Sequence, residues 1–434
     1  MPAVGNVLIV GGGTAGPALA ILLARAGVTV DVAEIEPGPT TLGSGITLQG
    51  NALRVLRDLG VWEEVSAAGF AFDSLGLRTP GGDLIAEIPD ARTGGPGLPA
   101  TLGMNRPELA AILAAAMREA GATMRYGLTV DAVSGTVSST VSSTVSSTVS
   151  GTAPGMVSDN VPGMVSDNVP GMVSDNGPGM VSDNGPGMVS DNAPGAMSDT
   201  VEVTFSDGTT GAYDLVVGAD GIRSHVRALI GVEAAPEPVG MGIWRIHTRR
   251  PKDVERTDLI YGGPCFIAGY CPTGADTMYA YLVEKARPRE DVGDKAAHLR
   301  ALAEGYGGAW DEIRAGITDP ARINYTWFES LLVDRPWNRG RTVLIGDAAH
   351  ACPPTLAQGA AQCLEDAAVL AELLLAADRL DQGLFDAFMD RRYDRVKAVV
   401  EASVRLARWQ LDGVRDADVP GLMGTIAAMV SERP

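Results

Sequence analysis

The chain has 434 residues, 45% of them hydrophobic, and a formal net charge of −19 at pH 7. Its length suits two or three domains with a sizeable core. The negative charge argues against nucleic acid and anionic membranes as partners. No stretch of about 18 residues is uniformly apolar, so we expect no membrane-spanning helix.

The start of the chain and its cysteines indicate the compartment. A strand expected from residue 7 leaves no room for a signal peptide. The four cysteines form neither a C-x-x-C pair nor a zinc pattern, so we expect no metal site. We interpret Cys352 and Cys363 as small packing residues rather than redox thiols. A reducing cytoplasm is the simplest location for such a protein.

The first element is a strand followed by a glycine-rich turn and a helix. Residues 7–10 are apolar, as in a buried parallel strand. The turn reads Gly-Gly-Gly-Thr-Ala-Gly over residues 11–16, and a helix is expected over 17–26. Glycines at these positions allow a pyrophosphate to approach the helix N-terminus, where free N–H groups favour anions. The pattern therefore predicts a dinucleotide site.

A second strand, expected over residues 28–32, should be followed by an acid that binds ribose hydroxyls. Glu34 and Glu36 both lie about 20 residues past the glycines, so spacing alone does not choose between them. Further along, a helix is expected to open at Arg106, and a strand is expected over 123–130.

A repetitive segment covers residues 133–199. It begins with a four-residue VSST-like period and continues with an eight-residue period, Pro-Gly-Met-Val-Ser-Asp-Asn plus one variable residue. Identical turns could stack into a small solenoid or form an interaction arm. We favour a solvated loop instead, because only Met and Val in each octamer can pack and Pro-Gly interrupts every copy. The strand expected over 201–205 places this insertion between two strands.

The middle of the chain carries a second glycine- and aspartate-containing motif, residues 214–221, and then a series of strands. These strands are expected over residues 243–247, 259–261, 266–270 and 278–283. Arg245 and His247 share one face of their strand by the period of two. Arg245 could anchor a substrate carboxylate or phenolate, and His247 could accept a proton. A surface location is the alternative for both.

The third motif, Gly-Asp-Ala-Ala-His at residues 346–350, precedes a helical C-terminal part. Residues 363–377 and 385–411 are apolar at helical spacing. The second of these helices carries Arg391, Arg392, Arg395 and Arg405, which we interpret as a solvated face, although a dimer seam is possible.

With these three motifs in this order, the chain resembles the class A flavoprotein monooxygenases, the p-hydroxybenzoate hydroxylase-like family. Residues 214–227 and 341–367 match the family pattern, and the similarity covers nearly the whole chain except the repeat. The resemblance implies FAD as cofactor, with Glu34 on the ribose and Asp347 on the ribityl chain. Asp220 would lie near the pyrophosphate, and residues 353–359 beside the isoalloxazine ring.

The cofactor-binding residues expected from the motifs and the resemblance are Gly11, Gly13, Thr14, Ala15, Gly16, Glu34, Arg106, Asp220, Gly346, Asp347, Pro353 and Gly359. His350 is expected to be structural rather than a general base. One departure is visible, because relatives commonly carry Arg after the ribose acid and this chain has Ile35.

The resemblance also implies the fold, an α/β protein with a Rossmann-like FAD-binding domain, an interleaved and mostly antiparallel β-sheet substrate domain, and C-terminal helices. We expect the FAD-binding domain at 1–70, 101–228 and 335–376, with the repeat inserted at 133–199. The substrate domain is expected at 71–100 and 229–334, and the helices at 377–434. The eight aromatic residues of the substrate domain could stack on a planar substrate, but about half should simply fill the sheet core.

The activity implied is hydroxylation of a small aromatic substrate by NADH or NADPH and O2, through a flavin C4a-hydroperoxide. Phenols, N-heteroaromatics and polyketide-type rings all remain open, and the protein is expected to be a monomer or homodimer. Flavin-dependent reductases use the same frame and are one alternative. A non-catalytic flavin-binding assembly protein is another.

Overall fold

The computed structural model describes residues 2–39, 43–134, 200–288 and 293–434. The repeat, apart from its first two residues, lies outside these ranges. The described residues belong to one compact unit of the chain. Within them the strands form four sheets, one of six strands, one of eight and two of three.

The six-stranded sheet is mostly parallel and contains the glycine-rich turn. Its order is β18-β19-β12-β1-β2-β8, and β18 is antiparallel to β19. The strands are β1 (Asn6–Val10), β2 (Thr29–Glu34), β8 (Thr123–Tyr126), β12 (Leu215–Gly218), β18 (Asn338–Arg339) and β19 (Thr342–Leu344). The apolar run of β1 is fully buried between its neighbours, as predicted. The helix after it, α1 (Ala15–Arg25), begins two residues earlier than expected.

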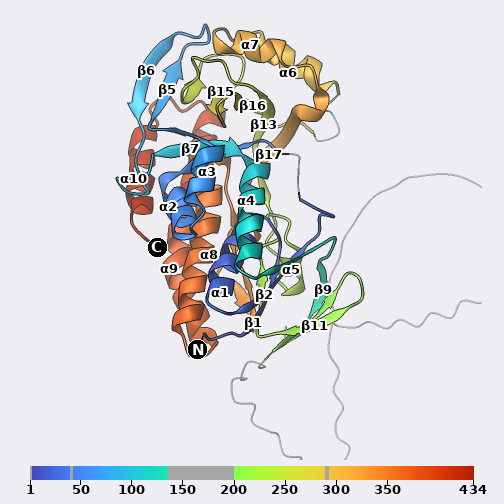
Figure 1. Cartoon of the computed structure of the whole chain (residues 1–434). Helices are drawn as coiled ribbons and strands as arrows, with labels where there is room; N and C mark the ends of the chain where they lie inside the picture. The colour runs from blue at the N-terminus through green and yellow to red at the C-terminus, as the bar shows by residue number, and fades with distance from the viewer. Residues whose placement is uncertain (1, 40–42, 135–199, 289–292) are drawn as a thin grey trace, which may run out of the picture. The chain divides into compact units, whose positions relative to one another are not determined.

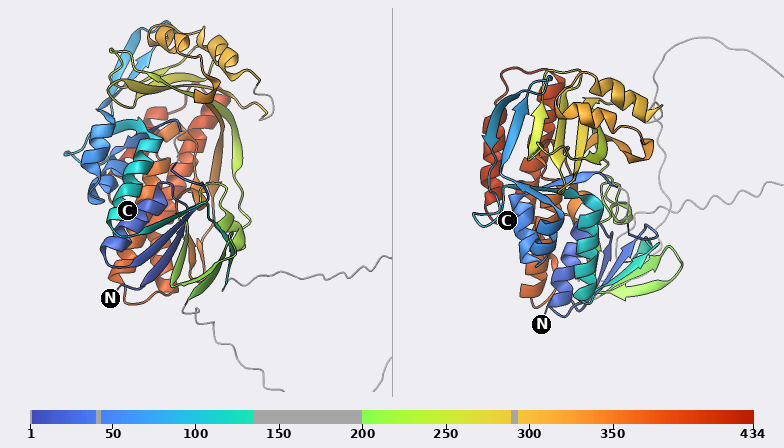
Figure 2. Two further views of the ribbon diagram at one scale, coloured as in Figure 1. Left: turned by 45° about the vertical axis from the view of Figure 1, so that its right-hand side comes forward. Right: turned by 45° about the horizontal axis from the view of Figure 1, so that its top comes forward.

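The strand predicted over residues 123–130 is in fact two strands. Gly127 has a positive φ of 70°, and this turn separates β8 from β9 (Val130–Val133). Strand β9 pairs antiparallel with β10 (Val201–Phe205), which has the bounds predicted for it, and β10 pairs with β11 (Thr210–Tyr213). This small sheet lies beside the six-stranded sheet, far from α6 and α7 (Figure 2). The repeat therefore connects two strands, as predicted, and the structure shows that these strands pair with each other.

The eight-stranded sheet contains all four strands predicted for the middle of the chain, each longer or shifted by a few residues. Its order is β20-β17-β13-β16-β15-β14-β5-β6. The strands are β5 (Ser74–Arg78), β6 (Leu84–Pro89), β13 (Glu237–Arg249), β14 (Thr257–Ile260), β15 (Ile267–Pro272), β16 (Thr277–Lys285), β17 (Ile323–Leu332) and β20 (His350–Ala351). Most pairs are antiparallel, and β14 with β5 is a parallel pair.

Two helices, α6 (Lys295–Ala303) and α7 (Ala309–Ala315), cover one face of the eight-stranded sheet (Figure 1). That face contributes Trp244, Tyr270 and Leu282 to a buried cluster that includes Trp310 of α7. We call the opposite face the inner face. Side chains alternate along a strand, so the residues that directly precede and follow these three in the sequence point to the inner face.

The inner face meets a three-stranded sheet of β3 (Gly45–Gln49), β7 (Thr101–Asn105) and β4 (Phe70–Phe72). The Tyr279 hydroxyl lies 2.8 Å from Thr47 Oγ1. A Cβ on Gly45 would overlap the Tyr279 ring, and one on Gly103 would overlap the Pro272 carbonyl oxygen. Glycine at these two positions allows the sheets to approach closely.

The remaining helices pack mainly around the six-stranded sheet and against one another. They are α2 (Gly50–Asp58), α3 (Trp62–Ala68), α4 (Arg106–Glu119), α5 (His225–Leu229), α8 (Gly359–Ala376), α9 (Gln382–Leu411) and α10 (Val419–Ser431), with short 3-10 turns η1 (Pro320–Arg322), η2 (Gly346–Ala348) and η3 (Pro354–Leu356). Helix α4 begins at Arg106, as predicted, and α1 packs against both α4 and α8.

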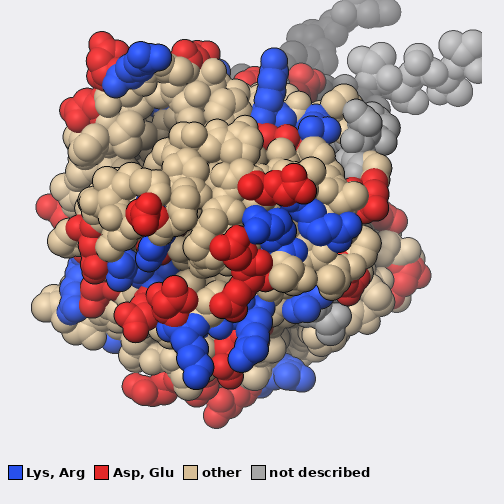
Figure 3. Space-filling view, turned by 90° about the horizontal axis from the view of Figure 1, so that it is seen from above, with Lys and Arg blue, Asp and Glu red and all other residues tan. Residues whose placement is uncertain are grey.

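The described helices include none that is long and apolar enough to span a membrane. Acidic and basic side chains are interspersed on the face shown in Figure 3. That face therefore carries no single extended basic patch of the kind that nucleic acid binding requires.

Candidate active site

The glycine-rich turn after β1 is shaped by two close approaches. Gly11 has a φ of 113°, and a Cβ there would overlap the Ala219 carbonyl oxygen. A Cβ on Gly16 would overlap the Gly11 carbonyl oxygen, so this glycine lets α1 pack against the turn. A Cβ on Gly13 would meet no described atom within 4 Å. Gly13 thus borders open space at the start of α1.

Helix α1 begins without a side-chain cap and without an acidic residue in its first turn. Thr14 is its N-cap, but the hydroxyl makes no capping hydrogen bond, and Ala15 is buried. The first N–H groups of a helix have no partner within the helix, and its dipole favours an anion there. This arrangement fits a pyrophosphate at the turn.

The two candidate ribose acids differ in position. Glu34 ends β2 and is half-buried, and its Oε2 accepts a 2.6 Å hydrogen bond from the Gly12 N–H. Glu36 is exposed, and its N–H donates to Glu34 Oε1 at 2.9 Å. Ile35, where relatives commonly have Arg, is 67% exposed. Of the two acids, Glu34 is therefore the one held against the glycine turn.

The third motif lies next to α1. Gly346 has a φ of 59°, and a Cβ there would lie 3.2 Å from the Ala15 Cβ and 3.0 Å from the Cys363 Sγ. Asp347 follows in η2 and is exposed, with a 3.5 Å contact from the Cys363 thiol to its Oδ1. Its carboxylate is thus accessible beside the start of α1, as a ribityl ligand must be.

Asp220 is used within the protein. Its Oδ1 accepts a hydrogen bond from the Ser224 hydroxyl at 2.5 Å. Its Oδ2 accepts from the N–H groups of His225 and Val226, at 2.7 and 3.0 Å. Both carboxylate oxygens therefore hold the first turn of α5. The Cα of Asp220 would lie only 2.9 Å from a Cβ on Gly11, so the residue still borders the glycine turn.

Pro353 and Gly359 lie on either side of η3, before α8. Pro353 is buried, and Ala357 between them has a positive φ of 51°. A Cβ on Gly359 would meet no described atom within 4 Å, and α8 begins there without a side-chain cap. A second uncapped helix N-terminus thus borders open space.

The motifs meet at the carboxyl ends of parallel strands. Strands β1, β12, β19 and β2 lie side by side and end at Val10, Gly218, Leu344 and Glu34. In open α/β sheets this edge is where dinucleotides bind. The uncapped α1, the open space at Gly13 and the accessible Asp347 carboxylate all fit FAD.

Arg106 opens α4 at the edge of this region. Its side chain is exposed, and among the described residues it has no carboxylate partner. Its positive charge acts to lower the pKa of Arg245 and that of Tyr279, both in the eight-stranded sheet. Arg106 therefore lies near the inner face.

Arg245 and His247 do share one face, the inner face, as predicted. Arg245 pairs with Tyr281, and His247 with Tyr279, across β13 and β16. Arg245 Nη1 donates to Thr326 Oγ1 at 2.9 Å, and the described part of the chain offers it no carboxylate. Burial lowers the pKa of Arg245 to about 10, and the charge of Arg106 acts in the same direction. The guanidinium still remains charged at neutral pH.

The tyrosines beside Arg245 stay protonated. Burial raises the pKa of Tyr279 and that of Tyr281 well above their ordinary value. Among the other aromatic residues, Trp244, Tyr270 and Phe328 are buried, as expected for core residues, whereas Tyr261 is 44% exposed.

His247 makes one hydrogen bond within the described ranges. Its Nδ1 lies 3.2 Å from Arg322 Nη2, and its buried Nε2 has no partner. Burial lowers the pKa of His247, and the charge of Arg322 lowers it further.

The interpretation of the α9 arginines as a solvated face was wrong for two of the four. The Arg392 side chain is fully buried and that of Arg395 is 9% exposed. Arg392 lies 2.8 Å from Glu365 and 2.7 Å from Asp366, both on α8, and Arg395 also contacts Glu365. A cation survives burial when it is paired and hydrogen-bonded, and these acids supply the partners.

This buried cluster reaches the third motif. Asp366 Oδ2 accepts from the Gly346 N–H at 2.8 Å and lies 2.7 Å from His350 Nε2. Burial raises the pKa of Asp366, but the charges of His350 and Arg392 outweigh it and lower the pKa to about 2. His350 is therefore engaged in structure, as expected. Sequence reasoning missed the role of Asp366. The available signal was the pair of adjacent acids, Glu365 and Asp366, on one apolar helix and the arginines on the next.

The thiols of the late motif favour their protonated forms. Burial raises the pKa of Cys352 to about 12, and that of Cys363 well above its ordinary value. The thiolate is the reactive form, so both cysteines act as packing residues, as predicted.

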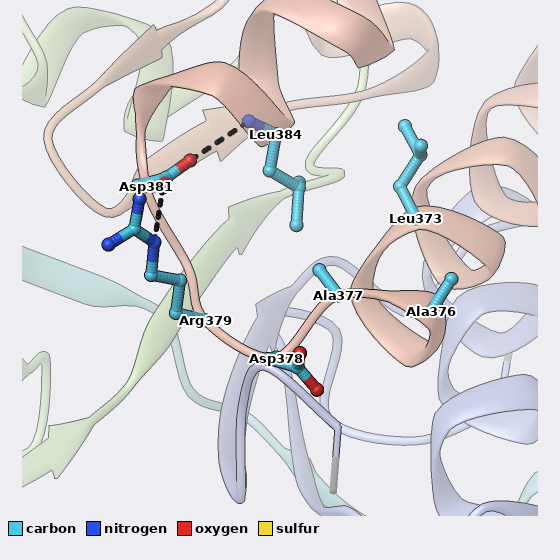
Figure 4. Close-up of a pocket in the computed structure, with 7 residues that line it drawn as sticks. All are labelled: Leu373, Ala376, Ala377, Asp378, Arg379, Asp381 and Leu384. Atoms are coloured by element: carbon cyan, nitrogen blue, oxygen red, sulfur yellow. Dashed lines mark hydrogen bonds and ion pairs between the residues drawn. The ribbon is translucent and has the colours of Figure 1, made fainter.

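A surface hollow at the α8–α9 turn lies apart from the predicted residues (Figure 4). It is lined by Leu373, Ala376, Ala377, Asp378, Arg379, Asp381 and Leu384. Arg379 Nε lies 2.8 Å from Asp381 Oδ2, and Asp381 accepts from the Leu384 N–H at the start of α9. The hollow contains no residue predicted to bind FAD or substrate.

Comparison with known proteins assigns the family. Residues 5–155 and 196–403 match the model of the FAD binding domain family. The Bacillus subtilis (strain 168) protein YetM, provisionally named an FAD-dependent monooxygenase, is 26% identical over 431 residues, 98% of this chain and 99% of that protein. The 6-hydroxynicotinate 3-monooxygenase of Pseudomonas fluorescens is 26% identical over 386 residues, 85% of this chain and 82% of its own.

A solved structure shares the fold. A variant of 2-methyl-3-hydroxypyridine-5-carboxylic acid oxygenase superposes with a TM-score of 0.71 at 19% identity, over 97% of this chain and 96% of its own. The chain therefore belongs to the FAD binding domain family, within the class A flavoprotein monooxygenases. It is an FAD-dependent monooxygenase of the aromatic hydroxylase type that takes its electrons from NAD(P)H. These findings confirm the predicted family, fold class and cofactor.

Proposed function

We propose that this monooxygenase hydroxylates a small phenolic or N-heteroaromatic ring bound on the inner face of the eight-stranded sheet. The carrying observation is Arg245, a guanidinium on that face without a carboxylate partner among the described residues. A half-buried guanidinium without a carboxylate partner favours an anionic oxygen, such as a phenolate or carboxylate. The name of the 6-hydroxynicotinate monooxygenase supports a hydroxylated N-heterocycle.

The cofactor would be held by the residues gathered at the strand ends. We assign the pyrophosphate to the glycine turn and the start of α1, the adenosine ribose to Glu34, and the ribityl chain to Asp347. The isoalloxazine ring would lie beside Pro353 and Gly359. When bound, FAD passes two electrons from NAD(P)H to O2, so that one oxygen atom enters the ring and the other leaves as water.

The protein's own contribution is positioning. Arg245 would orient the ring through its charged group, with Arg106 close enough to add a second positive charge. Tyr279 and Tyr281 remain protonated, and they supply aromatic surface that excludes water from the ring. Such fixed geometry is what a monooxygenase needs to hold the reacting carbon towards the flavin.

The domain roles follow the same division. We assign FAD binding to residues 1–70, 101–228 and 335–376, and the substrate side to 71–100 and 229–334, with residues 377–434 as supporting helices.

We further propose a cytoplasmic location, a monomer or homodimer as the working form, and no nucleic acid or membrane partner. The net charge of −19 supports the last of these.

The test is NAD(P)H oxidation in air by the FAD-loaded protein with phenols and hydroxylated pyridines or quinolones, followed by mass spectrometry. We expect at least one ring both to accelerate oxidation and to gain one oxygen atom. Arg245→Met should then lower kcat/KM about 10- to 100-fold, the effect of losing one hydrogen bond to a charged group.

Arg249→Met is the matched control, because Arg249 lies four positions beyond Arg245 on the same face of β13 and is exposed. If Arg245→Met retains wild-type kcat/KM for every oxygenated ring, the assignment of Arg245 fails. If no ring gains oxygen although NAD(P)H reduces the flavin, the proposed substrate class fails.

A further inference from the structure

The imidazole of His247 has one satisfied and one unsatisfied nitrogen. Nδ1 lies 3.2 Å from Arg322 Nη2, and Nε2 is buried without a hydrogen-bond partner in the described part of the chain. A buried polar atom without a partner costs free energy, and such atoms are uncommon in folded proteins. An oxygen of a bound ligand would satisfy the free Nε2.

The contact with Arg322 decides which nitrogen carries the proton. A guanidinium has five N–H donors and no acceptor, so Arg322 donates and Nδ1 must accept. A neutral imidazole has one proton, which is then on Nε2. His247 thus presents an N–H donor, and Nε2 cannot accept a proton in this state.

The charges around His247 favour the neutral ring. Burial and the positive charge of Arg322, at the end of η1, both lower its pKa, and Glu108 on α4 opposes them without reversing the shift. Tyr279 on β16 is uncharged, and Arg245 on β13 adds a positive charge on the same face. The ring is therefore neutral at neutral pH.

We infer that His247 donates a hydrogen bond from Nε2 to an oxygen of the substrate, and that Arg322 is a positioning residue that holds the imidazole in this donor form. The inference rests on the proposed function, since it assumes that the aromatic ring of the substrate lies on the inner face. It narrows the substrate to rings that present a carbonyl, phenolate or carboxylate oxygen at this point. It also replaces the role of proton acceptor with that of a donor.

The first test needs no substrate and stands apart from the proposed function. Long-range 1H–15N NMR of the histidine-labelled, FAD-loaded protein reports the tautomer of each imidazole, and His247→Gln assigns the His247 signals. We expect His247 to be neutral at pH 7 with the proton on Nε2. A proton on Nδ1, or a charged ring at this pH, would overturn the inference whatever the substrate is.

The second test compares two replacements of His247. Glutamine keeps an N–H donor and an acceptor for Arg322 but cannot take up a proton, whereas phenylalanine removes both. We expect kcat/KM for the oxygenated ring within about threefold of wild type in His247→Gln, and about tenfold lower in His247→Phe. Equal and large losses in both variants would favour a base and contradict the donor role.

The third test removes the positioning contact. In Arg322→Met the pKa of His247 should rise, and the Nδ1-protonated form should appear in the NMR spectrum. We expect kcat/KM to fall about threefold at pH 8 and to recover as the pH is lowered through that pKa, because the charged ring again carries a proton on Nε2. Arg249→Met removes a nearby positive charge without this contact and should leave tautomer and pH profile unchanged. An unchanged tautomer and profile in Arg322→Met would remove Arg322 from the inference.

Discussion

At the residue scale, the ends of the strands determine which polar groups face the cofactor. Side chains alternate along β2, and the strand ends at Glu34, so this carboxylate reaches the Gly12 N–H. Glu36 lies beyond the strand and is exposed. Asp347 is also positioned by the local backbone. It follows Gly346, whose φ of 59° glycine adopts without strain.

This difference between the two acids gives a prediction for FAD affinity. Glu34→Gln should raise the dissociation constant of FAD about 10- to 100-fold, because a charge-assisted hydrogen bond to the ribose is lost. Glu36→Gln should leave the constant within about twofold. Flavin fluorescence titration of the FAD-free protein measures both dissociation constants. The Tm of each FAD-free variant is the control, because Glu34 also accepts a hydrogen bond from the Gly12 N–H and its loss could destabilise the fold. Equal effects of the two substitutions would contradict the assignment of Glu34.

At the scale of elements, α8 and α9 are joined by a buried ionic cluster that also holds the flavin motif. Asp366 connects Arg392 with His350 and the Gly346 N–H. Arg395 extends the cluster to the end of α10, where it donates to the Met429 carbonyl oxygen at 2.6 Å. Cations are favourable at a helix C-terminus, so the cluster also anchors the last helix.

The cluster predicts an unequal response of two arginines on one helix. Arg392→Met leaves Glu365 and Asp366 buried with one partner fewer, and should lower the free energy of unfolding by about 3–5 kcal/mol. Arg405→Met, at an exposed position of α9, should change it by less than about 0.5 kcal/mol. Urea unfolding of the FAD-free protein at pH 7 measures both. A loss below about 1 kcal/mol in Arg392→Met would show that the two acids find other partners.

At the scale of the whole molecule, the family frame carries a long insertion between two paired strands. Val133 of β9 lies opposite Val203 of β10, and the Ser134 N–H donates to the Glu202 carbonyl oxygen at 2.8 Å. The chain thus leaves and re-enters the frame at neighbouring points. A short turn can join such points, because the cost of loop closure depends only weakly on length.

A deletion of residues 137–198 should therefore keep FAD binding and most of the activity. We expect Tm within a few degrees of the full-length protein, since β9 and β10 remain paired through their own hydrogen bonds. Absorbance of the bound flavin, thermal unfolding and NAD(P)H oxidation with the substrate measure the outcome. Loss of flavin, or of turnover with flavin still bound, would assign the repeat a role in the enzyme itself.

Much of the fold was predictable because its signals are local. Residues 7–10 and 201–205 form the predicted strands, and Arg106 opens the predicted helix. The strand predicted over 123–130 failed at Gly127, where a left-handed turn divides it. A glycine inside a predicted strand is compatible with either outcome. The two strands are separated only because they pair with different neighbours, β8 with β2 and β9 with β10.

The candidate site was predictable in its motifs but not in its connections. Helical spacing predicted α9, but it placed Arg392 on a solvated face and could not show that Glu365 and Asp366 of α8 lie against it. The period of two placed Arg245 and His247 together, whereas the partner of His247 comes from Arg322, 75 residues away. A titratable side chain takes its role from such partners, so the pattern alone suggested a base where the contacts indicate a donor.

By itself, the sequence determined the FAD frame, the order of its three motifs, the family and the place of the insertion. Each of these depends on a short stretch of residues whose backbone freedom or apolar period has a direct physical meaning. The spacing left Glu34 and Glu36 open, and the structure places Glu34, which the resemblance had favoured, against the glycine turn. Only the tertiary structure decided that Arg392 is buried and that Arg322 holds His247. Those outcomes depend on burial and on contacts between distant segments, which exist only after the chain has folded.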